Sequence, residues 1–132
     1  MILSRSKQYA LLAMIELGKR PPGEYLLCRR IARDKGIPFH YLCKLMQQMV
    51  NAGLVEAARG RSGGYRLAVP PARISIREVM RCIDGGQAEQ ECLLGLKACS
   101  DDNACAVHCQ WRPVKESLLD LLEQQTVAGL DC

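Results

Sequence analysis

Residues 26–50 read LLCRRIARDKGIPFHYLCKLMQQMV, and this stretch decides the fold. Its first ten residues, 26–35, place apolar side chains on one helical face and three arginines on the other. Gly36 can end that helix, and Pro38 suits the first turn of a second helix over residues 39–50. Two short helices joined by a tight, glycine-containing turn predict a helix-turn-helix.

A hairpin follows this motif. Residues 54–58 and 65–69 have the composition of two short strands, and the sequence between them, RGRSGG, is rich in glycine. The connecting loop carries Arg59 and Arg61. A basic hairpin directly after a helix-turn-helix predicts a wing, which lies along DNA phosphates or in the minor groove.

Further helices are predicted on both sides of the motif. Residues 9–17 (YALLAMIEL) are nearly all apolar, and Ser4 or Ser6 can cap the helix that they form. Residues 75–78 (SIRE) fit a capping box at the start of a fourth helix. We therefore expect a winged helix-turn-helix DNA-binding domain over residues 1–83.

The charges are distributed unevenly along the chain. Of the 18 lysines and arginines, 15 precede Cys82, whereas 9 of the 14 acidic residues follow Arg81. A basic segment beside an acidic one favours a polyanion as the partner of the first, although two solvated faces would give the same totals. We expect double-stranded DNA as the partner, and we expect five residues to contact it: His40, Tyr41 and Lys44 from the second helix of the motif, and Arg59 and Arg61 from the wing.

Eight cysteines in 132 residues need an explanation. Charged residues interrupt the N-terminus where a signal sequence would be apolar, and no later run is long enough to span a membrane, so we expect a cytoplasmic protein with no membrane partner. In a reducing compartment, clustered cysteines are metal ligands or redox thiols. Cys28 and Cys43 stand apart from the others, and we interpret them as small core residues.

The later cysteines form the pattern Cys92-x6-Cys99-x5-Cys105-x2-His108-Cys109. The first three are too widely spaced for zinc-knuckle pairs. Three soft ligands with one weaker ligand suit an iron–sulfur cluster, while zinc in a Cys3His site and a metal-free thiol switch remain open. A thiol enzyme using Cys105 or Cys109 with His108 lacks any sign of an oxyanion site, so we expect neither an enzyme nor a small-molecule substrate.

The C-terminal segment carries a broad apolar stripe. Residues 111–125 repeat apolar side chains at alternating intervals of three and four, which predicts one helix that Pro113 either opens or kinks. Packing on its own domain would satisfy this stripe, but a homodimer interface is the better explanation in a regulator with a single reading head.

Four motifs together resemble the IscR/NsrR-type family of bacterial transcription regulators: Leu3-Ser-x3-Gln-Tyr-Ala10, Tyr41-Leu42, Arg59-Gly-x2-Gly-Gly-Tyr65, and the cysteine pattern through His108-x2-Trp111. The resemblance implies a winged-helix homodimer with a [2Fe–2S] or [4Fe–4S] cluster on Cys92, Cys99 and Cys105. It also implies His108 as the fourth ligand. Other members use a carboxylate from the partner's first helix, where this chain has Gln8.

The expected architecture is mainly α-helical, with a winged helix-turn-helix domain (1–83), a cysteine-rich cluster-binding loop (84–110) and a dimerisation helix and tail (111–132). We expect a DNA-binding transcriptional regulator whose operator affinity is controlled by the cluster. A zinc-containing or cluster-free thiol/disulfide regulator of the same fold is the alternative.

Overall fold

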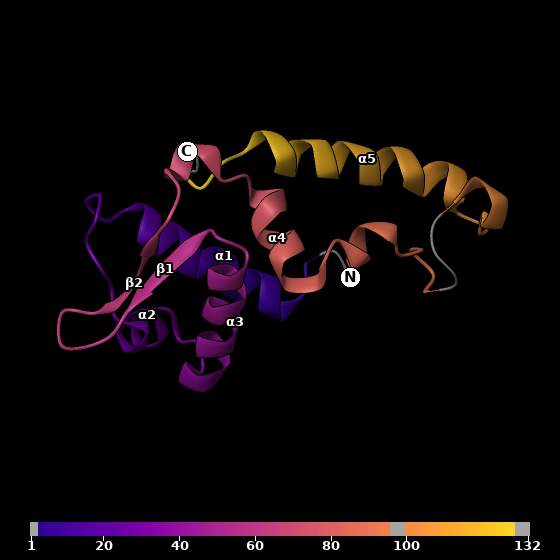
Figure 1. Ribbon diagram of the computed structural model, residues 1–132. Coiled ribbons are helices and arrows are strands. Elements are labelled where there is room, and N and C mark those ends of the chain that lie inside the picture. The colour runs from indigo at the N-terminus through magenta and orange to yellow at the C-terminus, as the bar shows by residue number, and fades with distance from the viewer. Residues whose placement is uncertain (1–2, 96–99, 129–132) are drawn as a thin grey trace.

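The computed structural model describes residues 3–95 and 100–128, and it is mainly helical, as predicted (Figure 1). Within these residues there are five α-helices and one two-stranded antiparallel sheet. The helices are α1 (Arg5–Gly18), α2 (Cys28–Lys35), α3 (Phe39–Asn51), α4 (Ile76–Asp84) and α5 (His108–Gln124), and the strands are β1 (Val55–Ala58) and β2 (Gly64–Leu67). Three short 3-10 turns are η1 (Pro71–Arg73), η2 (Gln87–Gln90) and η3 (Asp101–Asn103). In the described part of the chain, no helix is long and apolar enough to cross a membrane.

The first three helices, the hairpin and α4 enclose one apolar core, which we call the head. Its centre consists of side chains with no exposed surface: Ala10, Ala13, Met14, Leu42, Met46, Met49, Ile74 and Val79. The nearly continuous apolar run of residues 9–17 predicted that α1 is buried. Cys28 belongs to this core, which confirms it as a core residue, whereas Cys43 is half-buried and packs against the edge of the core.

Capping residues set the helix boundaries as the sequence predicted. Ser4 accepts a hydrogen bond from the Lys7 amide, so Ser4 rather than Ser6 caps α1, and the helix starts four residues before the predicted Tyr9. Ser75 accepts from the Glu78 amide at the start of α4. Gly36 ends α2 in the left-handed conformation, which glycine adopts without a steric penalty.

The prediction that α2 begins at Leu26 is wrong. Leu26 and Tyr65 exchange two backbone hydrogen bonds, with N–O distances of 2.8 and 2.9 Å, so Leu26 extends the sheet by one residue. Its side chain is buried in the head core. An apolar residue next to a helix can belong to the helix or to a strand. At Leu26, backbone pairing with β2 favoured the strand.

Helix α5 runs beyond the head, and the cysteine segment lies beside its N-terminal end (Figure 1). It begins at His108 and carries Pro113 inside it. After α5, the chain returns to the head, where Ser75 and Thr126 form a bridge and Val127 is buried in the core. The three-part division at residues 83 and 110 stays a prediction.

Candidate DNA-binding surface and cysteine site

The predicted recognition residues lie on the exposed side of α3. His40, Tyr41 and Lys44 are all exposed. Tyr41 is held in place, because its hydroxyl group shares a hydrogen bond with Ser6 and its ring lies edge-on to Tyr9, with 5.7 Å between ring centroids. The beginning of α3 is therefore braced against α1, while His40 and Lys44 remain exposed.

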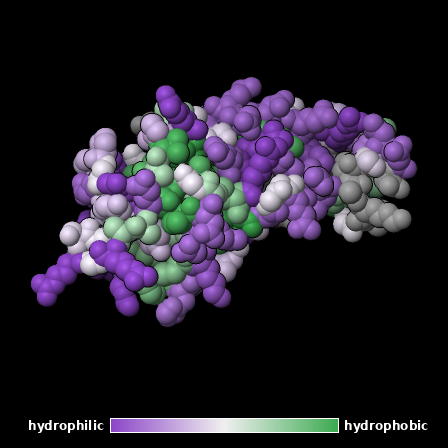
Figure 2. Space-filling view, viewed as in Figure 1, coloured by the Kyte–Doolittle hydropathy of each residue, from purple (hydrophilic) through white to green (hydrophobic). Residues whose placement is uncertain are grey.

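The wing presents the two predicted arginines. Arg59 and Arg61 are exposed in the loop between β1 and β2, at one end of the molecule (Figure 1). Hydrophilic side chains cover this end and the outer part of α5 (Figure 2). Gly64 has φ +126°, and a Cβ atom there would lie 2.4 Å from the Leu26 carbonyl oxygen, so strand β2 can lie this close to Leu26 only with glycine at this position.

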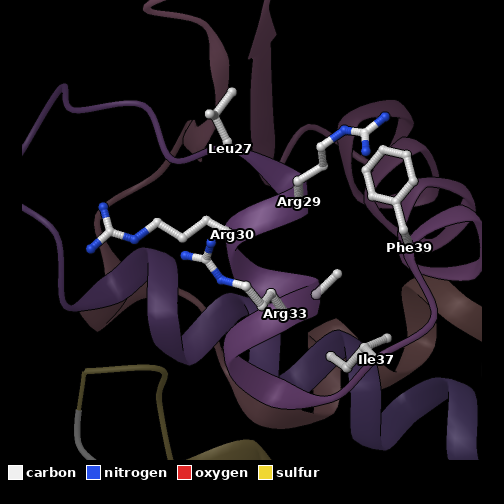
Figure 3. A pocket seen from close by; sticks show the side chains of 7 residues that line it. Leu27, Arg29, Arg30, Arg33, Ile37 and Phe39 are labelled. Atoms are coloured by element: carbon white, nitrogen blue, oxygen red, sulfur yellow. The ribbon is translucent and has the colours of Figure 1, made fainter.

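Helix α2 adds a basic surface that the sequence indicated but that we did not predict as a contact region. Arg29, Arg30 and Arg33 are exposed around a shallow hollow (Figure 3). The Arg29 guanidinium lies 4.5 Å from the centre of the Phe39 ring, whereas Arg30 and Arg33 extend to the opposite side and lie near Asp34. The run of arginines on one helical face was the available signal. In a helix-turn-helix, the first helix crosses the DNA backbone, where such cations bind phosphates.

The cysteine segment, residues 85–107, is joined to α4 by a group of ion pairs that we call the first charged clamp. Glu89 in η2 accepts two hydrogen bonds from Arg77 and two from Arg81, with N–O distances of 3.0 to 3.1 Å. The Arg77 guanidinium, with a smaller effect from Arg81, holds the pKa of the Glu89 carboxyl group below its ordinary value. Bidentate pairs of this kind fix geometry. The chain entering Cys92 is therefore held against α4.

Two of the predicted cluster ligands meet inside the segment. A hydrogen bond with the Cys92 thiol is the largest cause that raises the pKa of Cys105. Cys92 is buried, and the backbone amide of Leu94 donates a hydrogen bond to its Sγ atom at 3.4 Å. Cys99 lies outside the described residues. The structure thus brings Cys92 and Cys105 together from opposite ends of the segment.

A second charged clamp joins the later part of the segment to α5. Asp101 in η3 pairs with Arg112, and its Oδ1 atom lies 3.1 Å from His108 Nε2. The hydrogen bond from Arg112, followed by that from His108, lowers the pKa of Asp101. His108 is buried and Cys109 is exposed in the first turn of α5. His108 therefore has a carboxylate partner at one ring nitrogen, and it belongs to the same small region as Cys105.

The surroundings of Cys92 suit a soft, thiolate-bound group. Within residues 3–95 and 100–128, no three His, Cys, Asp or Glu side chains are arranged to hold a metal ion. However, Cys92 and Trp111 both line a half-open apolar hollow of about 370 Å³. The Trp111 indole N–H is buried and has no hydrogen-bond partner in the described structure. A buried thiol in an apolar hollow is a setting that an iron–sulfur cluster can use, because thiolates are its preferred ligands.

An ion pair connects the cysteine segment with the first helix of the head. Lys7 Nζ lies 2.6 Å from Asp84 Oδ2, and the Lys7 side chain is only 3% exposed. Asp84 also accepts hydrogen bonds from the amides of Gly86 and Ala88, which begin the segment. A change in the position of the segment can therefore reach α1 through Asp84.

A family model for iron-dependent transcriptional regulators, called Rrf2, matches residues 3–131. The chain belongs to the Rrf2 family. It is 35% identical over 131 residues to Rv1287, an HTH-type regulator of Mycobacterium tuberculosis strain H37Rv, and the match covers 98% of this chain and 81% of that protein.

Solved structures of Rrf2-family regulators have the same fold. CymR, the global cysteine regulator of B. subtilis, matches with a TM-score of 0.79 and 27% identity, covering 97% of this chain and 94% of that one. IscR of T. potens matches with a TM-score of 0.77 and 27% identity, covering 97% and 84%. This chain is accordingly a winged-helix transcriptional regulator of the Rrf2 family. The family model and the mycobacterial relative are both described as transcriptional regulators.

Proposed function

We propose that this regulator is a homodimer whose operator affinity is controlled by an iron–sulfur cluster bound at Cys92, Cys99 and Cys105. The contact between the Cys92 and Cys105 thiols is the observation that carries this proposal. Both thiols lie in a segment that Glu89 and Asp101 clamp at its two ends. Clamped ends reduce the entropy lost when the ligands converge. The family description, iron-dependent, agrees with iron as the metal.

His108 is our proposed fourth ligand. It is buried next to the segment, and a neutral imidazole can bind iron through one nitrogen while the other is hydrogen-bonded to a carboxylate. Asp101 is such a carboxylate, at 3.1 Å from Nε2. Cys109, which is exposed in the same turn, is the competing ligand. Gln8 is exposed on α1, and its amide is a poor substitute for the carboxylate of other members.

The dimer would form along α5. Val114 and Leu121 on this helix are 57% and 52% exposed, although both belong to the apolar stripe. Leu118 and Trp111, in contrast, pack against Ile76 and Met80 of α4. The stripe therefore has more apolar surface than its own chain covers, and an isologous partner helix would cover the remainder.

Regulation would follow from the contacts around the segment. Ligation would fix the segment between α4 and α5, and the Lys7–Asp84 pair would pass its position to α1, which braces Tyr41 at the start of α3. The two recognition helices of a dimer must match half-sites roughly 34 Å apart. A cluster changes its ligation with iron supply and oxidation, so its loss would alter this separation.

Anaerobic purification with iron and sulfide analysis and a visible spectrum tests the cluster. We expect coloured protein whose charge-transfer absorption disappears in Cys92→Ala, Cys99→Ala and Cys105→Ala. Cys82→Ala, which changes a half-buried cysteine of α4 outside the segment, is the matched control and should keep the colour. Colourless protein with stoichiometric zinc would contradict the proposal. His108→Ala should retain iron but shift the visible spectrum. An unchanged spectrum would mean that Cys109, and not His108, is the fourth ligand.

A cluster-free thiol switch is the second candidate, and the same Cys92–Cys105 contact favours it. Two thiols in hydrogen-bond contact can form a disulfide when an oxidant is supplied. This candidate predicts no bound iron after anaerobic purification and a Cys92–Cys105 cross-linked peptide after mild oxidation. Anaerobic iron analysis therefore separates the two candidates in a single preparation.

Sedimentation equilibrium tests the dimer. Leu121→Asp places a charge on the uncovered part of the α5 stripe, and we expect it to shift the protein from dimer to monomer because the charge must be desolvated on association. Asp120→Ala, at the neighbouring exposed position, should leave the mass unchanged. A monomeric wild-type protein would overturn the dimer proposal without affecting the cluster.

A further inference from the structure

Cys28 and Cys43 form a thiol pair inside the DNA-binding head. Their Sγ atoms are 3.6 Å apart, although the residues are separated by 15 positions in the sequence. Cys28 is the first residue of α2, and Cys43 lies in α3, so the pair bridges the two helices of the helix-turn-helix. A disulfide bond is roughly 2.05 Å long, and the sulfur atoms need to approach by only about 1.5 Å to form it.

Three elements meet at this pair. Cys28 follows Leu26, whose backbone pairs with Tyr65 of the wing strand β2. Burial raises the pKa of the Tyr65 hydroxyl group, and the nearby charges of Cys28 and Cys43 in their ionised forms raise it further. A change in the sulfur–sulfur distance therefore acts on α2, the recognition helix and the base of the wing together.

Small oxidants can reach the pair. Cys28 and Cys43 line an open hollow of about 520 Å³ between the helix-turn-helix and the wing. Arg29 and Arg59 line the same hollow, and positive charge stabilises a thiolate or an approaching anion. Cys28 is buried, whereas Cys43 is half-buried, so the hollow gives better access to Cys43.

The two thiols have different environments. Burial, followed by the hydrogen bond with Cys43, raises the pKa of Cys28 to about 12, so Cys28 keeps its proton at neutral pH. Cys43 is the more exposed of the two thiols in the hollow, so it is the thiol that a peroxide reaches first. An attacking thiol with a protonated thiol beside it is the arrangement of a peroxide-reactive cysteine and its resolving partner.

We propose that Cys28 and Cys43 are a second thiol–disulfide site, independent of the segment at Cys92, whose oxidation by a hydroperoxide lowers the affinity of the head for DNA. The Cys43 thiolate attacks hydrogen peroxide, the O–O bond breaks, and the products are a Cys43 sulfenic acid and, with the proton that Cys43 released, one water. The Cys28 sulfur then attacks the Cys43 sulfur. Hydroxide leaves, takes the Cys28 proton and becomes a second water. In total, two thiols and one peroxide give one disulfide and two waters.

The disulfide would change how the head reads DNA. It pulls the inner side of α3 toward the start of α2, and the exposed side of α3, with His40 and Lys44, moves with it. Packed helices shift as units, because a close-packed core transmits displacement. The site requires no cluster, so it can operate whether or not the segment at Cys92 binds iron.

Peptide mapping of the full-length protein tests whether the disulfide forms. Reduced protein is treated with equimolar hydrogen peroxide, free thiols are alkylated, and the protein is digested with trypsin. We expect the peptides 20–29 and 36–44 as one species, two hydrogen atoms lighter than the sum of both, which dithiothreitol separates. If these peptides stay unlinked while other cysteines of the chain are oxidised, the site does not exist.

A binding assay tests the consequence. The probe is a fluorescein-labelled duplex that the reduced protein selects from a random-sequence pool, titrated without cluster reconstitution. Peroxide should weaken binding at least tenfold, and dithiothreitol should restore it. Cys43→Ser and Cys28→Ala should bind equally well before and after peroxide, while Cys82→Ser should respond like the wild type. Circular dichroism melts verify that the variants fold. If only one of Cys43→Ser and Cys28→Ala folds, its response to peroxide is sufficient to test the proposal. Equal loss of affinity in the wild type and in both pair variants would overturn the proposal.

Discussion

The head and the cysteine segment are stabilised by different forces. The head has one continuous apolar core, to which helices α1 to α4 and the sheet contribute. Between Gly85 and Val107, in contrast, the buried residues of the described structure are Gly86, Ala88 and Cys92. Instead of a core, this segment has charged clamps at Glu89 and Asp101.

The difference teaches where regulation can act. Apolar burial stabilises the head without any ligand, since the hydrophobic effect requires only that water be excluded. The Asp101–Arg112 pair is exposed, and surface ion pairs contribute little each, so the Asp101 end of the segment can change its conformation at low cost. A regulator needs both properties, namely a rigid reading head and a responsive site beside it.

Replacing one leucine by alanine in the head and one in the cysteine segment should give the largest difference in the free energy of unfolding. Leu42→Ala removes a fully buried side chain between α3 and the head core, and we expect a loss of roughly 3 kcal/mol in the free energy of unfolding. Leu94→Ala, at a position 52% exposed in the segment, should cost less than about 0.5 kcal/mol. Urea denaturation of both variants measures this, and similar losses would show that the segment has a core of its own.

Two glycine substitutions in the wing should also differ in how much stability they cost, because one glycine contacts the head and the other does not. Gly64→Ala requires φ +126° and places Cβ against the Leu26 carbonyl oxygen, so we expect a loss of about 2 kcal/mol in stability. Gly60→Ala also requires positive φ, but nothing lies within 4 Å of its Cβ, and about 1 kcal/mol is expected. Thermal melts compare the two. An equal effect would mean that the contact between the wing and Leu26 does not matter.

The ion pair that joins the two regions should make stability depend on pH. Burial alone would raise the pKa of Asp84, but hydrogen bonds from Lys7, Ala88 and Gly86 lower it below its ordinary value. A carboxyl group with a lowered folded-state pKa stabilises the fold above its unfolded pKa, about 4, and this contribution is lost as the pH falls through the folded value. Asp84→Asn should therefore cost about 1.5 kcal/mol at pH 7, with the difference from wild type shrinking as the pH falls below the unfolded pKa of about 4.

Urea titrations at several pH values measure this effect. The double variant Lys7→Met/Asp84→Asn is the control, because it also removes the buried cation and should be no less stable than Asp84→Asn alone. A difference between Asp84→Asn and the wild type that stays constant with pH would mean that the charge of Asp84 contributes nothing.

Removing one wing arginine should have the smallest effect. Arg59→Ala should weaken operator binding by roughly 1 kcal/mol and reduce the salt dependence by about one phosphate contact, without changing stability. Arg73→Ala in η1, an exposed arginine outside the helix-turn-helix and the wing, is the control and should bind normally. Unchanged binding by Arg59→Ala would remove the wing from the DNA interface.

Local patterns predicted most of the head. The apolar run of residues 9–17 predicted a buried first helix, and Ser75 predicted the start of α4, because a cap and an apolar run each depend on residues within a few positions. The assignment of Leu26 failed because its strand partner, Tyr65, lies far along the chain. The arginines of α2 were visible in the sequence, but the proximity of the Arg29 guanidinium to the Phe39 ring was not.

The candidate sites were also predicted only in part. The sequence by itself determined which residues can bind metal or DNA, since thiol, imidazole and guanidinium chemistry belongs to the side chain wherever it lies. Only the tertiary structure decided which of them meet: Cys92 with Cys105, His108 with Asp101, Lys7 with Asp84, and Cys28 with Cys43. Each pair is brought together by the packing of separate elements, and no periodicity within one helix or strand encodes a distance between two of them.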